Sequence, residues 1–153
     1  MMDQAMIDKL NEILRHEWTG VAQYSQAAFV VTGLWREVYN EIFLESAKES
    51  FGHAQIIGQK IAALGGVPTI ERNQVKQTDD LHEMLKNALE FESMAVKHYE
   101  EALAMADGKN RPLVVLLEEV LLQEQDGVDQ FTMILKDPAV AAQAKGGNAS
   151  KVG

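Results

Sequence analysis

Apolar residues recur at alternating steps of three and four over four long segments of this 153-residue chain. The segments cover about residues 3–32, 36–64, 80–106 and 110–137. This spacing places the apolar side chains of each segment on one face of an α-helix. Amphipathic helices bury such faces by packing them against one another, so the pattern predicts an all-α bundle of four helices.

The connections between these segments predict the topology. Gly33 separates the first two segments and residues 107–108 separate the last two, and such short turns join antiparallel neighbours. Residues 65–78 have no periodicity and are long for a loop in a compact domain. A crossover between two helices that run in the same direction needs about this length. We therefore expect two antiparallel hairpins joined by a long crossover.

The bundle accounts for residues 1–137, which we interpret as one domain large enough to bury a sizeable core. Asp137 and Pro138 end the fourth helical pattern, and residues 138–153 are small, polar and rich in glycine. That composition predicts a flexible C-terminal tail. Residues 138–145 match a helical pattern poorly, so a fifth helix is expected to be weak or absent.

Composition excludes several classes of function. The formal net charge is −9 and the lysines are scattered, so nucleic-acid binding is not expected. No apolar run is long enough to cross a bilayer and the N-terminus lacks a signal-peptide pattern, so we expect a cytoplasmic protein without membrane association. Because the chain has no cysteine, a bound metal would be held by Glu, Asp and His, which suit iron, manganese or zinc.

The apolar residues on one face of each helix form a row, which we call its apolar stripe. One polar residue interrupts the middle of each stripe: Glu17, His53, Glu92 and Glu124. In a bundle of the expected topology these four midpoints meet at one level. A buried, unpaired carboxylate costs on the order of several kcal/mol, and the stripes carry no Lys or Arg at this level. A metal ion is the simplest counter-charge, and a metal-free polar core is the alternative.

A second pattern relates the two halves of the chain. Tyr24 follows Glu17 by seven residues, as Tyr99 follows Glu92, and two helical turns place each pair on one face. Repeated halves around one acidic centre are how a two-metal site is built from a single chain. The tyrosines either support the site and donate electrons or are core aromatics that hydrogen-bond a carboxylate. The other histidines are expected at the surface: His16, His82 and His98.

The sequence around these residues resembles bacterioferritin. The similarity covers about residues 5–136 and is most specific over residues 10–17, which read Leu-Asn-Glu-Ile-Leu-Arg-His-Glu. The other matching segments are Gln23-Tyr24, His53-Ala54, Gly-Gly-Val-Pro at 65–68, Ala-Leu-Glu-Phe-Glu at 88–92, Tyr99 and residues 124–129. The resemblance implies a ferritin-like fold with a di-iron carboxylate site.

In that family one Glu comes from each of two helices and a Glu-x-x-His pair from each of the other two. By this resemblance, the sequence keeps four of the six ligands, and these four are also the expected catalytic residues: Glu17, His53, Glu92 and Glu124. Ser50 stands where the first pair has Glu, and Gly127 stands where the second pair has His. Glu49, four residues before His53, is a candidate additional ligand. Asp126 is a less favoured one, because a regular helix turns it about 100° away.

By the same resemblance, the expected cofactor is iron, with one or two ions per subunit. The family's haem is held by a methionine just before the site histidine, and residues 7–83 contain no methionine, so haem is not expected. The expected function is oxidation of Fe(II) by O2 or peroxide and storage or detoxification of iron in a homo-oligomer, from a dimer to a shell. The alternative is a catalytically poor structural or binding subunit. A DNA-protecting mini-ferritin is disfavoured by the acidity and the ligand spacing.

Overall fold

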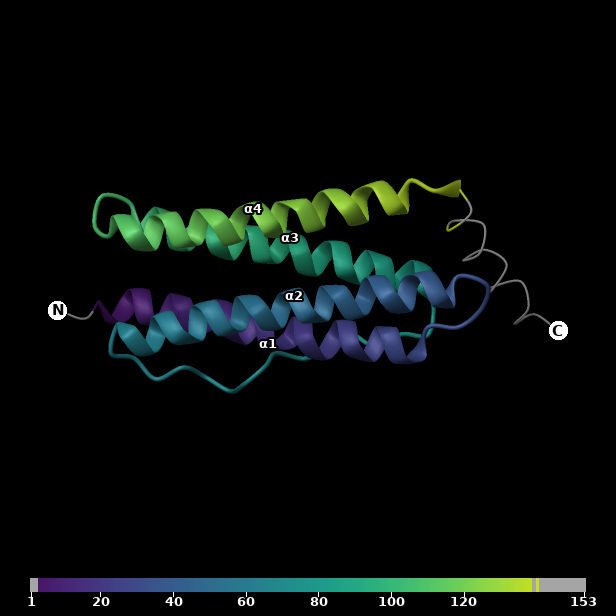
Figure 1. The fold of residues 1–153 in the computed structure, drawn as a ribbon, viewed down its shortest axis with the longest axis horizontal. Coiled ribbons are helices and arrows are strands. Elements are labelled where there is room, and N and C mark those ends of the chain that lie inside the picture. The colour runs from purple at the N-terminus through teal and green to yellow at the C-terminus, as the bar shows by residue number, and fades with distance from the viewer. Residues whose placement is uncertain (1–2, 139, 141–153) are drawn as a thin grey trace.

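The computed structural model describes residues 3–138 and 140, which form a bundle of α-helices (Figure 1). The helices are α1 (Gln4–Val30), α2 (Arg36–Ala63), α3 (Leu81–Ala106) and α4 (Arg111–Leu135). The predicted all-α fold of four helices is confirmed. Most of the predicted tail and of the fifth-helix candidate, at residues 139 and 141–153, lies outside the described residues. In the described part of the chain, no helix combines the length and the apolar character needed to cross a membrane.

Figure 1 shows two antiparallel hairpins, α1 with α2 and α3 with α4, and a long crossover between them. Because residues 64–80 travel the length of the bundle, α2 and α3 run in the same direction, as the sequence predicts. The crossover follows α1, whose side chains hydrogen-bond its backbone. The contacts are Asn11 with Val67 and Thr69, Trp18 with Thr69, Thr19 with Asn73, and Gln23 with Lys76.

Short polar side chains cap the N-termini of three of the helices. The carboxylates of Asp3 and Asp80 and the amide oxygen of Asn110 each accept a hydrogen bond from a backbone N–H in the first turn of the helix that follows. Such caps satisfy N–H groups that have no partner within the helix. These local signals explain why the helix starts can be predicted from the sequence to within a residue or two.

The core consists of two apolar clusters on either side of a polar level. One cluster contains Leu10, Leu14, Ile57, Ile61 and Leu117, and the other contains Phe43, Leu85, Phe91 and Phe131. Between them lie the buried polar side chains that interrupt each stripe, Glu17, His53, Glu92 and Glu124. The predicted polar level is therefore enclosed by hydrocarbon along the bundle, where a charge is poorly screened.

The first half of α2 is rotated relative to the predicted stripe. The steps of three and four in this segment run through Tyr39, Ile42, Ser46, His53 and Ile57, which predicts Ile42 and Ser46 as core positions. Both are only half-buried, whereas Phe43 and Ala47 are buried. The rotation places the largest apolar side chain of this stretch, Phe43, against the core, where burying it gives the greatest hydrophobic gain. The second half of the stripe, from His53 to Ile57, faces the core as predicted.

Gly20 provides a test of packing between the helices. A Cβ at Gly20 would overlap Cζ of Phe91 and lie 2.5 Å from Oγ of Ser50. We expect Gly20→Ala to lower the free energy of unfolding by about 1 kcal/mol or more, because overpacking of roughly 1–3 kcal/mol exceeds the helix propensity that alanine gains. Urea denaturation measures this difference.

Gly52 is the matched control for this substitution. It also lies within a helix, but a Cβ there would meet no atom within 4 Å. Gly52→Ala should therefore raise the free energy of unfolding by about 0.5–1 kcal/mol. Equal effects of the two substitutions would contradict the close approach at Gly20.

Candidate metal centre

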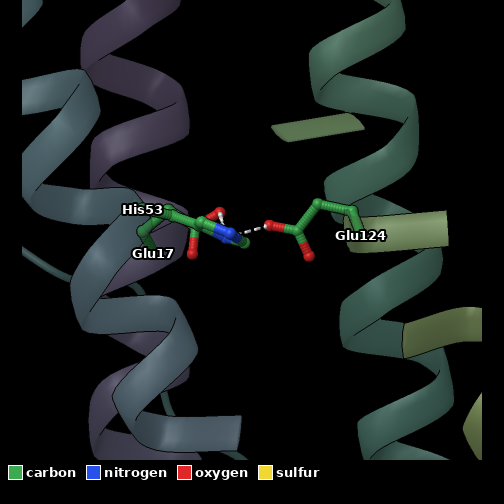
Figure 2. Close-up of side chains that lie close together, drawn as sticks. All are labelled: Glu17, His53 and Glu124. Carbon is green, nitrogen blue, oxygen red and sulfur yellow. Dashed lines mark hydrogen bonds and ion pairs between the residues drawn. The ribbon is translucent and has the colours of Figure 1, made fainter. Parts of the chain in front are cut away.

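Three of the four midpoint residues converge inside the bundle. Figure 2 shows Glu17 from α1, His53 from α2 and Glu124 from α4 pointing toward one another. One possible ligand atom from each lies within 4.8 Å of the others, and none of the three residues is more than 2% exposed. Nδ1 of His53 is 2.9 Å from Oε1 of Glu124 and 3.7 Å from Oε1 of Glu17. Their role as metal ligands remains a prediction.

Glu92, the fourth midpoint residue, is buried on α3 but does not belong to this group of three. Its Oε1 accepts a hydrogen bond of 2.6 Å from the hydroxyl of Tyr24. Its carboxyl group also lies against Gly127, where an added Cβ would be only 2.9 Å from Cδ of Glu92. The glycine at the family's histidine position therefore gives the Glu92 carboxyl group room against α4.

Two buried tyrosines each donate a hydrogen bond to one of the carboxylates. The Tyr99 hydroxyl donates to Oε1 of Glu17 over 3.1 Å, in the same way that Tyr24 donates to Glu92. Burial and the nearby carboxylates raise the pKa of both tyrosines well above the ordinary value, so both remain hydroxyl donors. The repeat seen in the sequence thus corresponds to two Tyr–Glu hydrogen bonds in the bundle.

The acidic groups and the imidazole shift one another's pKa. Burial opposes a charge on His53, but the hydrogen bond with Glu124 and the proximity of Glu17 outweigh it and raise its pKa to about 11. Burial and the carboxylate of Glu124 raise the pKa of Glu92 to about 9. Burial and repulsion from Glu17 raise the pKa of Glu124 to about 7. Without a metal, protons therefore balance the charge here, and a cation must displace them.

One oxygen at this centre has no partner within the described chain. Oε2 of Glu17 is buried, yet it accepts no hydrogen bond. A buried polar atom left in this way is unfavourable, and a cation between Glu17, His53 and Glu124 would satisfy it. Carboxylate oxygens with one imidazole nitrogen suit Fe(II), Mn(II) or Zn(II). The residues present therefore fit a divalent metal ion.

Glu49, the candidate additional ligand, lies on the other edge of the imidazole. Its Oε1 is 3.8 Å from Nε2 of His53, its side chain is half exposed, and it is not part of the group of three. Burial raises its pKa. Ser50 is buried close to Gly20, one helical turn from His53. A contribution of Glu49 to the site remains a prediction.

Gln123 also reaches this centre, although the sequence does not predict it: its Oε1 lies 2.7 Å from Nε2 of His53. It also lines a surface groove of about 310 Å³ together with Glu49, Asp126, Gly127 and Gln130. No pattern in the sequence distinguishes Gln123, because a residue next to a helical ligand points about 100° away from it. Only the placement of α2 beside α4 reveals the contact.

The expected surface position of His16 is wrong. His16 is only 7% exposed, stacks on the ring of Phe91 with centroids 4.0 Å apart, and donates from Nε2 to the Phe91 carbonyl oxygen over 3.0 Å. Burial lowers its pKa to about 4, so the ring is neutral. The cause is the packing of α3 across α1, which covers a helix face that has no apolar stripe of its own.

Comparison with known proteins identifies the family to which this fold belongs. A family model described as a ferritin-like domain matches residues 7–139. A ferritin-like, di-iron-carboxylate protein from Bacillus anthracis str. Ames is 33% identical and superposes with a TM-score of 0.84, over 87% of this chain and 96% of that one. The bacterioferritin-related protein of Bacteroides fragilis, described as a dodecameric thioferritin, is 27% identical with a TM-score of 0.84, over 94% of this chain and 92% of that one. This chain belongs to the ferritin-like family.

Proposed function

We propose that this chain binds Fe(II) at Glu17, His53 and Glu124, with Glu92 beside them, and passes electrons from Fe(II) to O2 or peroxide. The observation that carries the proposal is the unpartnered, buried oxygen of Glu17 next to two further ligand groups. Membership of the ferritin-like family supports iron as the metal. We further propose that the ferric product is stored or detoxified in a homo-oligomer, in line with the dodecameric description of the Bacteroides fragilis protein.

Each residue has a specific part in this proposal. Glu17 and Glu124 supply carboxylate oxygens, and His53 supplies Nδ1 after losing the proton that it shares with Glu124. The hydroxyl groups of Tyr99 and Tyr24 hold Glu17 and Glu92 in place through hydrogen bonds, which keeps the carboxylates oriented before an ion arrives. The iron supplies the redox chemistry, and the protein supplies ligands and a largely dry interior.

A second candidate function is metal binding without rapid oxidation. The arrangement of Glu92 favours it, because this carboxyl group is bonded to Tyr24 and lies outside the group of three. A second ion near Glu92 would find Gly127 in place of an imidazole ligand. The chain would then be a structural or binding subunit of a ferritin-like assembly.

Aerobic addition of Fe(II), followed by the absorbance of the ferric product, tests both functions. We expect a fast phase in the wild-type protein that becomes at least about 10-fold slower in Glu124→Gln, which removes a ligand charge but keeps the side-chain shape. Glu118→Gln, an exposed change on the same helix, should leave the rate unchanged. Tight Fe(II) binding without a fast phase would favour the second function, and no Fe(II) binding would exclude both.

A further inference from the structure

We propose that Gln123 is a positioning residue for His53: its amide oxygen accepts the Nε2 proton, so that Nδ1 is the nitrogen presented to the metal. The inference rests on the proposed metal-binding function and names a residue outside the expected ligand set. It also predicts which of the two ring nitrogens binds the ion.

The two edges of the His53 ring face different surroundings. Nδ1 points to the carboxylates of Glu124 and Glu17, on the side where the ligand atoms gather (Figure 2). Nε2 points to Oε1 of Gln123 at 2.7 Å, whereas Oε1 of Glu49 is 3.8 Å away and beyond hydrogen-bond distance. A neutral imidazole has one N–H and one lone pair, so an acceptor at Nε2 leaves the lone pair on Nδ1.

A hydrogen bond of this kind has known consequences in metal sites. It fixes the tautomer and the orientation of the ring, and its loss commonly weakens metal binding about 10- to 100-fold. Gln123 provides the acceptor without a charge, at a centre that already contains several carboxylates. It contacts His53, which is 2% exposed, and it also lines the surface groove that contains Glu49. Removing its amide would open Nε2 to water.

Binding of Zn(II), a diamagnetic probe, tests this assignment. Gln123→Met removes the acceptor at nearly constant length, Gln123→Glu keeps an acceptor at the same place, and Gln125→Met is the matched control. Gln125 lies on the same helix and is also exposed, but its amide is bonded to Asp129. Two quantities are measured: the Zn(II) affinity by competition titration, and the ¹⁵N resonances of His53, identified by their loss in His53→Ala.

In Zn(II)-loaded wild-type protein we expect a metal-shifted Nδ1 and a protonated Nε2 whose hydrogen exchanges slowly with water. In Gln123→Met the affinity should fall about 10-fold or more and the Nε2 proton should exchange faster. Gln123→Glu should restore slow exchange, and Gln125→Met should match the wild type. Urea denaturation of the metal-free variants checks that each is folded under the titration conditions. Gln123→Met should unfold at a lower urea concentration than the wild type, because it removes the acceptor of the Nε2 proton.

The possible contrary results are distinguishable. If wild-type protein shows no Zn(II) effect at His53, the proposed function and the role of Gln123 both fail. If the wild type binds Zn(II) and Gln123→Met retains its affinity and slow exchange, only the role of Gln123 fails. If slow exchange is lost in Glu49→Gln but kept in Gln123→Met, Glu49 is the acceptor and the assignment is overturned.

Discussion

Glu17→Gln is expected to abolish tight metal binding while leaving the bundle folded. The loss of affinity should exceed the roughly 10- to 100-fold effect of losing an outer hydrogen-bond partner, because this substitution removes a carboxylate that faces the ion. The metal-free variant should still fold, since Tyr99 can donate to the new amide oxygen and since repulsion with Glu124 is relieved. Zn(II) or Co(II) titration measures the affinity, and urea denaturation measures the stability.

Asp8→Asn is the control for this result. Asp8 is an exposed residue on the same helix, and its carboxylate is bonded only to Gln4 among the contacts described for it. The Asp8→Asn substitution removes the same unit of charge from α1 without touching the centre, so metal affinity should stay within about 2-fold of the wild type. Wild-type affinity in Glu17→Gln would show that the buried carboxylate is not a ligand.

The second large effect concerns pH. Metal-free protein should lose stability as the pH rises from 7 to 9. The folded-state pKa values of His53, about 11, and Glu92, about 9, both lie above the ordinary values of 6.5 and 4.5. In this window the folded chain therefore holds more protons than the unfolded chain, and its stability falls as the pH rises.

Each extra proton corresponds to about 1.4 kcal/mol per pH unit, so the total is on the order of several kcal/mol. The lowered pKa of His16, about 4, does not contribute in this window, because above pH 6.5 its ring is largely neutral in the folded and the unfolded chain alike. Urea denaturation at pH 7, 8 and 9 with a chelator measures the slope. Glu92→Gln should flatten it by about one proton, and Zn(II) should reverse it, because the metal replaces the protons. A flat or rising profile for metal-free protein would contradict the shifts.

Much of the fold follows from local signals in the sequence. The stripes, the caps at Asp80 and Asn110 and the long segment after Gly65 are enough to predict four helices and their topology, because each depends on neighbours within a few residues. The level shared by Glu17, His53 and Glu124 follows as well, since each lies about halfway along its helix. Helix length and connection order determine that height in any bundle of this kind.

The tertiary structure decided the contacts that depend on how far each helix rotates about its axis and how closely it approaches its neighbours. The hydrogen bond from His53 to Gln123, the packing of Glu92 against Gly127 and the burial of His16 under α3 all arise in this way. A rotation of one residue turns a side chain by about 100°, enough to move it from the core to the surface. The sequence alone therefore determined the level at which Glu17, His53 and Glu124 meet, whereas packing between helices determined their contacts, brought Gln123 to His53 and left Glu92 outside the group of three.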